Sequence, residues 1–221
     1  MNAHPLLPKL RQLKLSGMLQ TLDLRAAQAT ERQLSSIEFL ALLLDDELER
    51  RSQQHLANRL AMSGCDSLKT LTQFDFSAAP GINRTLIQDL ATCAFVPRHE
   101  NILLCGPTGV GKSHLANAIA IEALKRDYRV LSKPTHRLLN DLHTSRATGA
   151  NARLMSRILT CDLLVLDDFG LQLLSAQAVQ DLYEIITERY ERGSLIITSH
   201  RAFTEWAEVF NNDLLSSAAL D

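Results

Sequence analysis

The sequence contains little of what marks several special classes of protein. Nine glycines and six prolines among 221 residues are too few for a collagen-like or low-complexity chain. A hydrophobic content of 46% excludes wholesale disorder, and no apolar run approaches the ~18 residues that a membrane span needs. The first residues lack the basic and apolar regions of a secretory signal. Together these absences predict a globular protein of the cytoplasm that does not associate with membranes.

Cysteines and aromatic side chains are also scarce. The four cysteines are scattered without a CxxC pair, which predicts reduced, structural thiols and argues against a disulfide framework or a zinc site. Aromatic residues make up 5% of the chain, too few for a platform that stacks the bases of single-stranded nucleic acid. The only tryptophan, Trp206, is therefore expected in the core.

The charges are unevenly distributed along the chain. Residues 1–75 carry nine basic and nine acidic side chains, which balance. Residues 76–160 carry eleven basic and five acidic side chains (+6), and residues 161–221 carry three and eleven (−8). The net charge of −2 therefore conceals a basic middle third, which indicates a negatively charged partner such as DNA.

The apolar pattern divides the chain into two parts. As far as the turn signal Ser63-Gly64, apolar residues such as Ile37, Leu40 and Leu44 recur every three or four positions, and residues 1–73 are predicted to form a small helical interaction domain. Beyond them, short apolar runs alternate with helical patterns; the runs are 101–105, 128–131, 163–166 and 194–198. This alternation predicts that residues 74–221 form an α/β domain, a parallel sheet flanked by helices.

Residues 106–113 match the phosphate-loop pattern GxxxxGK[ST], between a predicted strand and a predicted helix. Glycines let successive backbone N–H groups curl toward phosphate oxygens, and the start of the helix adds partial positive charge. Lys112 is expected to reach the β- and γ-phosphates of ATP, and the Ser113 hydroxyl to coordinate Mg²⁺. The predicted nucleotide-binding residues are Gly106, Pro107, Thr108, Gly109, Val110, Gly111, Lys112, Ser113 and His114.

Two carboxylates follow the third apolar run, Leu163 to Leu166. In a parallel sheet they lie at the carboxyl edge of the strand, where α/β proteins bind ligands. Asp167 is predicted to hold Mg²⁺ through water, and Asp168 to act as the base that polarises the attacking water.

The fourth apolar run also ends in polar residues. In additional-strand P-loop ATPases this strand lies between the strands that carry the other two motifs, and its end contacts the γ-phosphate. Thr198, Ser199 or His200 could make that contact, and we take His200 as the predicted catalytic residue.

Taken together, the chain resembles the IstB-like family of transposition helper ATPases, which are related to the DnaC helicase loaders within the AAA+ superfamily. The resemblance covers nearly the whole chain. Its elements are residues 42–51, Phe74-Asp75-Phe76, 100–104, 109–116, 189–192 and 198–206. It implies an additional-strand AAA+ fold preceded by a helical N-terminal domain, with ATP and Mg²⁺ as cofactors.

The family pattern also continues past Asp221, with a lid that carries a second sensor arginine. The resemblance therefore implies that the lid and the arginine finger are missing and that ATP hydrolysis by these 221 residues is weak. If hydrolysis is not weak, Arg189, Arg192 or Arg201 is expected to supply the finger.

The basic middle third is the predicted DNA contact. The residues selected for it are Lys133, Arg137, Arg146 and Arg153. No base-reading motif accompanies them, so binding to the backbone of double-stranded DNA with little sequence preference is expected.

Four functions remain open from the sequence. The leading hypothesis is an ATP-dependent helper that self-associates on double-stranded DNA and recruits the transposase of the same insertion element. A DnaC-like loader of a replicative helicase uses the same motifs. The third is a nucleotide-gated DNA-binding adaptor with negligible catalysis, and the fourth is a P-loop kinase of small molecules, which no acceptor pocket supports.

Overall fold

The computed structural model describes residues 5–210. Its contacts divide the chain into two compact units, residues 1–58 and 59–221, which are described separately below. Residues 59–73, assigned from the sequence to the helical domain, belong by contact to the second unit. The functional boundary after residue 73 stays a prediction.

The first unit consists of helices α1 (Leu7–Gln12), α2 (Ser16–Glu31) and the greater part of α3 (Ser36–Ser63). The start of α3 is fixed by a reciprocal cap, because Glu38 accepts from the Ser35 backbone while the Ser35 hydroxyl accepts from the Glu38 N–H. The buried core of this unit is Met18, Leu22 and Leu43. The predicted helical character of the N-terminal segment is therefore confirmed.

A glycine lets α2 and α3 come close together. A Cβ on Gly17 would lie 2.7 Å from the carbonyl oxygen of Asp46, and the Gly17 N–H donates to the buried Glu47 carboxylate at 2.6 Å. Beside it, hydrogen bonds from Arg25 lower the pKa of Asp46 to about 2. The contact between these helices is thus polar and tightly spaced as well as apolar.

The second unit is built on a parallel sheet of four strands in the order β1-β4-β3-β2. The strands are β1 (Ile102–Cys105), β2 (Val130–Pro134), β3 (Leu163–Phe169) and β4 (Ser194–Ser199). All four predicted strands are present, and β4 lies between β1 and β3, as expected for an additional-strand P-loop domain. The predicted fold class is confirmed.

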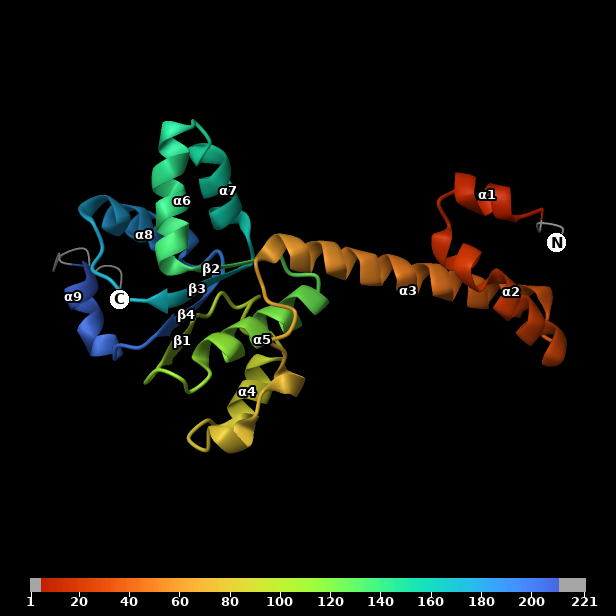
Figure 1. The fold of residues 1–221 in the computed structure, drawn as a ribbon, viewed down its shortest axis with the longest axis horizontal. Coiled ribbons are helices and arrows are strands. Elements are labelled where there is room, and N and C mark those ends of the chain that lie inside the picture. Colours follow the sequence, from red (N-terminus) through yellow and green to blue (C-terminus); the bar gives the residue numbers. More distant parts are fainter. Residues whose placement is uncertain (1–4, 211–221) are drawn as a thin grey trace. The chain divides into compact units, whose positions relative to one another are not determined.

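Helices cover both faces of this sheet. Figure 1 shows α5 (Lys112–Lys125) below the sheet, on the side of α4 (Arg84–Leu90). Three helices of this unit lie above the sheet. Those helices are α6 (Thr135–Ala147), α7 (Asn151–Thr160) and α8 (Ala176–Arg189). Short helices complete the unit: η1 (Leu71–Gln73), η2 (Phe76–Ala78), η3 (Phe203–Glu205) and α9 (Trp206–Phe210).

A hydrophobic core lies between the sheet and α6, α7 and α8, and includes Leu142, Ile158, Leu164 and Ile185. Trp206 is buried in this core, with its ring centroid 4.5 Å from that of Phe169, so its predicted place is confirmed. The cysteines are free thiols, and burial raises the pKa of Cys93 to about 11. Such a thiol carries little thiolate at neutral pH, which fits a structural role.

Two sequence-based expectations meet the limits of the described region. Within residues 5–210, no helix is both long and apolar enough to cross a bilayer. The cytoplasmic location stays a prediction. The expectation of a missing lid and arginine finger concerns the end of the chain at Asp221, which lies outside the described residues.

The end of α8 is held by a buried arginine. Arg189 is 1% exposed, and its guanidinium donates to the backbone carbonyls of Ile158, Cys161 and Ser194 at 2.8 Å each. It ties α7, the start of β3 and the start of β4 to α8. Because it is buried within its own unit, Arg189 cannot reach a neighbouring subunit as an arginine finger.

We expect Arg189→Ala to lower the free energy of unfolding by about 3 kcal/mol or more, because three buried carbonyls lose charged donors. The measurement is urea unfolding followed by circular dichroism. Arg192→Ala is the matched control, since Arg192 is exposed and pairs only with Glu188, and we expect it to change stability by about 0.5 kcal/mol or less. Equal losses in the two variants would contradict the structural role of Arg189.

Candidate nucleotide-binding site

Three sequence motifs meet at the carboxyl edge of the sheet. The phosphate loop follows β1, Asp167 and Asp168 lie near the end of β3, and His200 follows β4 directly. In a parallel sheet these strand ends lie on one side, so residues 88 positions apart in the sequence come into contact. All three predicted catalytic residues, Lys112, Asp168 and His200, lie in this cluster.

The phosphate loop has the glycine conformations that its curl requires. Gly109 and Gly111 have φ values of +85° and +90°, in the left-handed region. A Cβ on Gly111 would lie 2.5 Å from the ring of Phe74, so the chain also needs a glycine there for close packing. Ser113, half-buried, follows in the first turn of α5.

Lys112 is nearly buried, and its ammonium lies inside the loop. The Nζ atom donates to the carbonyl oxygens of Gly106 and Pro107 at 2.8 Å each, and it lies 3.2 Å from His200 Nδ1. The Thr108 hydroxyl oxygen also lies close to His200 Nδ1, at 3.3 Å. The loop therefore holds its one cation at the centre of the curl, the position from which a lysine can approach phosphate oxygens.

Thr198 organises the two carboxylates. From the sequence it was one of three alternatives for the contact at the end of this strand. The buried Thr198 hydroxyl donates to Asp167 Oδ1 at 2.5 Å and accepts from the Asp168 N–H at 2.9 Å. The third alternative, Ser199, is also buried and donates to the carbonyl of Phe169. Thr198 and Ser199 are thus occupied within the sheet, which leaves the partly buried His200 as the accessible polar group at this strand end.

His200 bridges the lysine and the second carboxylate. Its Nε2 lies 3.3 Å from Asp168 Oδ1, while its Nδ1 faces the Lys112 ammonium. An ammonium only donates, so Nδ1 accepts and Nε2 carries the proton that points at Asp168. Asp168 has a φ of +55°, a left-handed conformation that aspartate tolerates better than most residues. This geometry places His200 and Asp168 as one unit beside Lys112.

His114 takes part in a different contact. Its Nε2 lies 2.8 Å from the carbonyl oxygen of Thr70, and its ring packs edge-on against Phe74. Further along α5, the Asn117 side chain donates to the carbonyls of Asp66 and Lys69. The structure therefore uses His114 to fasten the preceding segment onto α5, and a nucleotide contact by His114 stays a prediction.

The oxygen donors at this edge fit a magnesium ion chemically. The Asp167 carboxylate and the Ser113 hydroxyl are hard oxygen ligands, which Mg²⁺ prefers. Asp167 keeps its second carboxylate oxygen free of the Thr198 contact. No group of three or more His, Cys, Asp or Glu able to hold a metal occurs among the described residues, so a transition-metal centre gains no support there.

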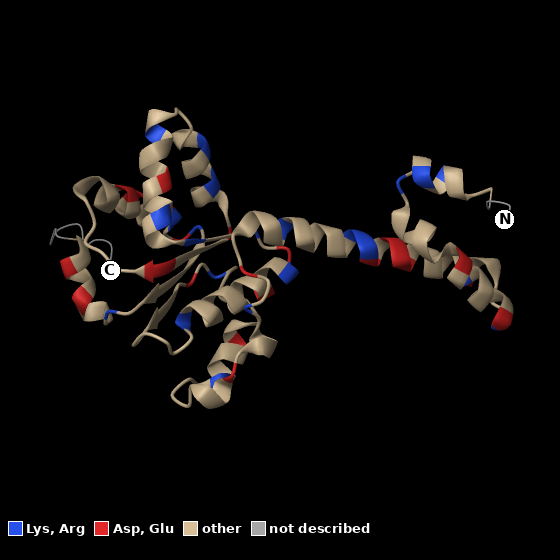
Figure 2. Cartoon of the chain, in the orientation of Figure 1, with Lys and Arg blue, Asp and Glu red and all other residues tan. Residues whose placement is uncertain are grey.

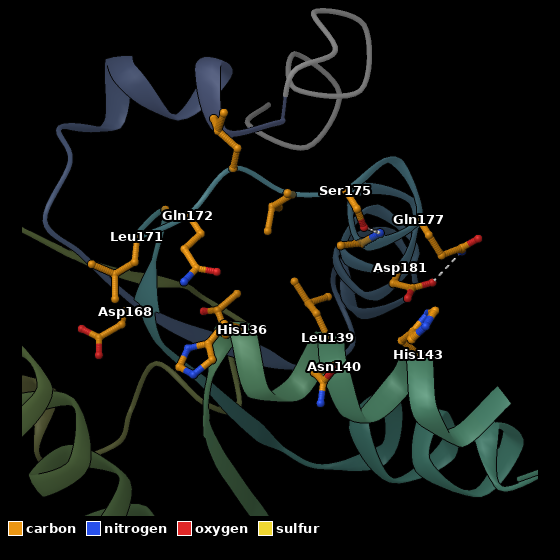
Figure 3. A pocket seen from close by; sticks show the side chains of 15 residues that line it. His136, Leu139, Asn140, His143, Asp168, Leu171, Gln172, Ser175, Gln177 and Asp181 are labelled. Atoms are coloured by element: carbon orange, nitrogen blue, oxygen red, sulfur yellow. Dashed lines mark hydrogen bonds between the residues drawn. The ribbon is translucent and has the colours of Figure 1, made fainter. Parts of the chain in front are cut away.

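A cleft of 310 Å³ adjoins Asp168. Figure 3 shows His136, Leu139, Asn140 and His143 of α6 on one side and the loop with Leu171 and Gln172 on the other. Its fifteen lining residues include two aspartates and no lysine or arginine. The cleft is therefore not built to hold phosphate groups.

The four predicted DNA contacts fall into two pairs. Lys133 forms an ion pair with Asp141, and Arg146 forms one with the buried Asp181, in which Nη1 and Oδ2 are 2.9 Å apart. The exposed Arg137 on α6 and Arg153 on α7 form no ion pair within the described part of the chain. Only the second pair has its charge free for a ligand.

Known proteins resemble this chain over most of its length. The profile of the family "IstB-like ATP binding protein" matches residues 8–221. The chain belongs to the IstB-like family. An ATP-binding protein of insertion sequence IS21 from Pseudomonas aeruginosa is 34% identical over 99% of this chain and 82% of its own length. An insertion-sequence ATP-binding protein of Mycobacterium tuberculosis is 38% identical over 96% of this chain and 85% of its own length. The resemblance found in the sequence is confirmed.

Solved structures support the fold of this IstB-like chain. The DnaC helicase loader matches with a TM-score of 0.53 and 24% identity, over 61% of this chain and 81% of its own. DnaA from Aquifex aeolicus, bound to AMPPCP, matches with a TM-score of 0.60 and 22% identity. This match covers 70% of this chain and 48% of the DnaA chain. At these identities the likeness shows the fold alone.

We expect Lys112→Ala to abolish ATP binding without unfolding the protein, because the ammonium lies in the loop and the core does not depend on it. The measurement is binding of a fluorescent ATP analogue, with circular dichroism as the control for folding. Wild-type affinity in a folded variant would contradict the phosphate-loop assignment.

We expect Thr198→Val to weaken Mg²⁺-dependent ATP binding by about tenfold or more, because groups that orient a metal ligand contribute roughly 10–100-fold in affinity. Thr198→Ser keeps the hydroxyl and is the matched control. The measurement is a Mg²⁺ titration at fixed ATP. A valine variant with wild-type Mg²⁺ dependence would show that Thr198 serves only the packing of β4.

Proposed function

We propose that this IstB-like protein is an ATP-dependent, DNA-binding helper of a transposase, which self-associates on target DNA and recruits the transposase to it. The observation that carries the proposal is the cluster at one sheet edge of Lys112, Asp167, Asp168 and His200, in a chain whose relatives are ATP-binding proteins of insertion sequences.

Nucleotide binding is the best-supported step. The phosphate loop presents its backbone N–H groups and Lys112 to the β- and γ-phosphates, and α5 begins at Lys112 with its partial positive end toward them. Ser113 and Asp167 would hold Mg²⁺, which when bound neutralises charge on the β- and γ-phosphate oxygens. Thr198 fixes the orientation of the Asp167 carboxylate before the nucleotide arrives.

For hydrolysis we assign Asp168 as the base that orients the attacking water. In this structure its carboxylate lies against His200 Nε2 at 3.3 Å. His200 in turn reaches the Lys112 ammonium, so a change at the phosphates can pass through one imidazole to the base. His200 is thus proposed as the sensor of the γ-phosphate.

For DNA binding we assign α6 and α7. Figure 2 shows Lys and Arg distributed over both helices. Of the four residues selected from the sequence, Arg137 and Arg153 have charges that are not balanced by a described carboxylate. Lys133 and Arg146 already form ion pairs, so their contribution to phosphate binding requires that those pairs open. Arginines at the surface favour phosphate contacts that carry no base information.

A structural link connects this DNA surface with the nucleotide site. The Thr135 hydroxyl, at the first residue of α6, donates to the backbone carbonyl of Asp167 at 2.9 Å. A displacement of α6 on DNA binding would therefore be transmitted through this hydrogen bond to the end of β3, which carries both carboxylates. On this basis we expect double-stranded DNA to change the rate of ATP hydrolysis.

We expect the double variant Arg137→Ala, Arg153→Ala to flatten the dependence of log affinity on log salt by up to about 2 per subunit, since each phosphate contact contributes roughly 0.9 to the slope. The loss should be nearly equal on unrelated duplexes. The measurement is fluorescence anisotropy at several salt concentrations, with Arg192→Ala as the control for a surface arginine outside α6 and α7. An unchanged slope would place the DNA on another surface.

Phosphate release, measured with and without duplex DNA, tests the enzymatic part of the proposal. A DNA-responsive rate that Asp168→Asn removes while ATP binding persists supports the ATPase. Tight ATP and DNA binding without turnover favours the nucleotide-gated adaptor. Transposase recruitment is tested separately, by whether the transposase of the same insertion element, and not a replicative helicase, binds the ATP-loaded protein on DNA.

A further inference from the structure

A second cationic site lies at the opposite edge of the sheet from the phosphate loop. It is a cavity of 220 Å³ beside the first residues of β2, whereas the nucleotide site lies at the carboxyl ends of the strands. We call it the arginine cleft. Its lining includes Arg59 and Met62 of α3, Leu124 of α5, Arg129, Leu131 of β2 and Arg157 of α7.

The three arginines of the cleft differ in how their charges are balanced. Arg129 is fully paired, because Asp162 accepts from its Nη2 at 2.7 Å and from its Nε at 3.2 Å. Arg59 pairs with Asp127, whose side chain is 83% exposed and therefore well hydrated. Arg157 forms no ion pair among the described residues, and its guanidinium donates to the backbone carbonyl of Met62.

The cleft also has an unsatisfied donor and apolar walls. The Nε atom of Arg59 is buried without a hydrogen-bond partner among the described residues. Met62, Leu124 and Leu131 contribute apolar lining to the same cavity. Positive charge next to apolar walls is costly unless an anion accompanies it, and a guanidinium fork matches a carboxylate in geometry.

From this arrangement we infer that the arginine cleft binds the C-terminal residue of a partner protein, with the terminal carboxylate on Arg157 and Arg59 and an apolar side chain against Met62, Leu124 and Leu131. The volume decides the size of the ligand: 220 Å³ lies below the range of pockets for drug-sized molecules and suits a single residue. In a C-terminal residue the carboxylate and the side chain are bonded to the same Cα. Both groups can therefore enter one small cavity together.

The chemistry of the cleft argues against other anions. A DNA backbone carries phosphates joined by sugars but no free aliphatic side chain that could enter the cavity and cover its apolar walls. The inference goes beyond the proposed function and does not depend on it, because none of the cleft residues belongs to the phosphate loop, β3 or β4.

The test uses the full chain and a fluorescein-labelled hexapeptide that ends in leucine with a free carboxylate. We expect saturable binding by fluorescence anisotropy. Amidation of the peptide's C-terminus should weaken binding by about tenfold or more, the magnitude of one charged hydrogen bond. Equal binding of the free and amidated peptides would overturn the inference.

Variants on α7 localise the binding. Arg157→Gln should weaken peptide binding by about tenfold, and Arg157→Lys, which keeps the charge but lacks the fork, by several-fold. Arg153→Gln is the matched control one turn earlier on the same helix, and it should change affinity less than about twofold. An equal effect of Arg153→Gln and Arg157→Gln would show non-specific charge attraction and overturn the assignment.

Two further measurements distinguish a protein C-terminus from a free small carboxylate and from DNA. Binding of 4-methylpentanoate as tight as that of the peptide, or displacement of the peptide by duplex DNA at equal ionic strength, would overturn the protein partner. ATP affinity and thermal stability of the Arg157 variants should equal those of the wild type. Failure of peptide binding with intact ATP binding would therefore refute the cleft and leave the proposed function untouched.

Discussion

The nucleotide site depends on the pairing of β3 with β4 and on the point where that pairing breaks. Leu163 to Leu166 match Ser194 to Ile197 in regular register, and the register then shifts before Phe169 pairs with Ser199. Within this irregularity the Asp168 N–H donates to the Thr198 hydroxyl. The same hydroxyl donates to the carboxylate of Asp167, so one side chain holds both aspartates.

The irregularity has consequences for both neighbouring groups. Asp168, the second-last residue of β3, has a left-handed φ, and its carboxylate lies 3.3 Å from His200 Nε2. His200 follows β4 directly. It contacts the ammonium of Lys112, which belongs to the phosphate loop that follows β1, the other neighbour of β4. The strand order β1-β4-β3 is what allows a residue of β4 to touch both motifs, since β4 lies between them.

Charges on the surface have to be judged by their partners as well as by their number. The basic middle third suggested a single DNA-binding surface, yet its members serve different ends. Arg146 neutralises the buried Asp181, and Arg129 pairs with Asp162 where β2 and β3 begin. Arg137 and Arg153 keep their charges available for phosphates, while Arg157 faces the arginine cleft. Arginines that look alike along the sequence thus separate into those that pair with carboxylates of the protein and those with free charge, to which we assign the proposed DNA contact and the inferred cleft.

Much of this protein was determined by its sequence. The alternation of apolar runs predicted the parallel sheet, the phosphate-loop pattern located the nucleotide site, and the Ser63-Gly64 turn signal marked the end of α3, because these features depend on local periodicity and local backbone freedom. Tertiary structure decided the rest. Only the fold shows that Thr198 orders the carboxylates, that His114 fastens the preceding segment to α5, and that Arg189 is buried. Each of these depends on contacts between residues 28 to 44 positions apart, which no local pattern specifies.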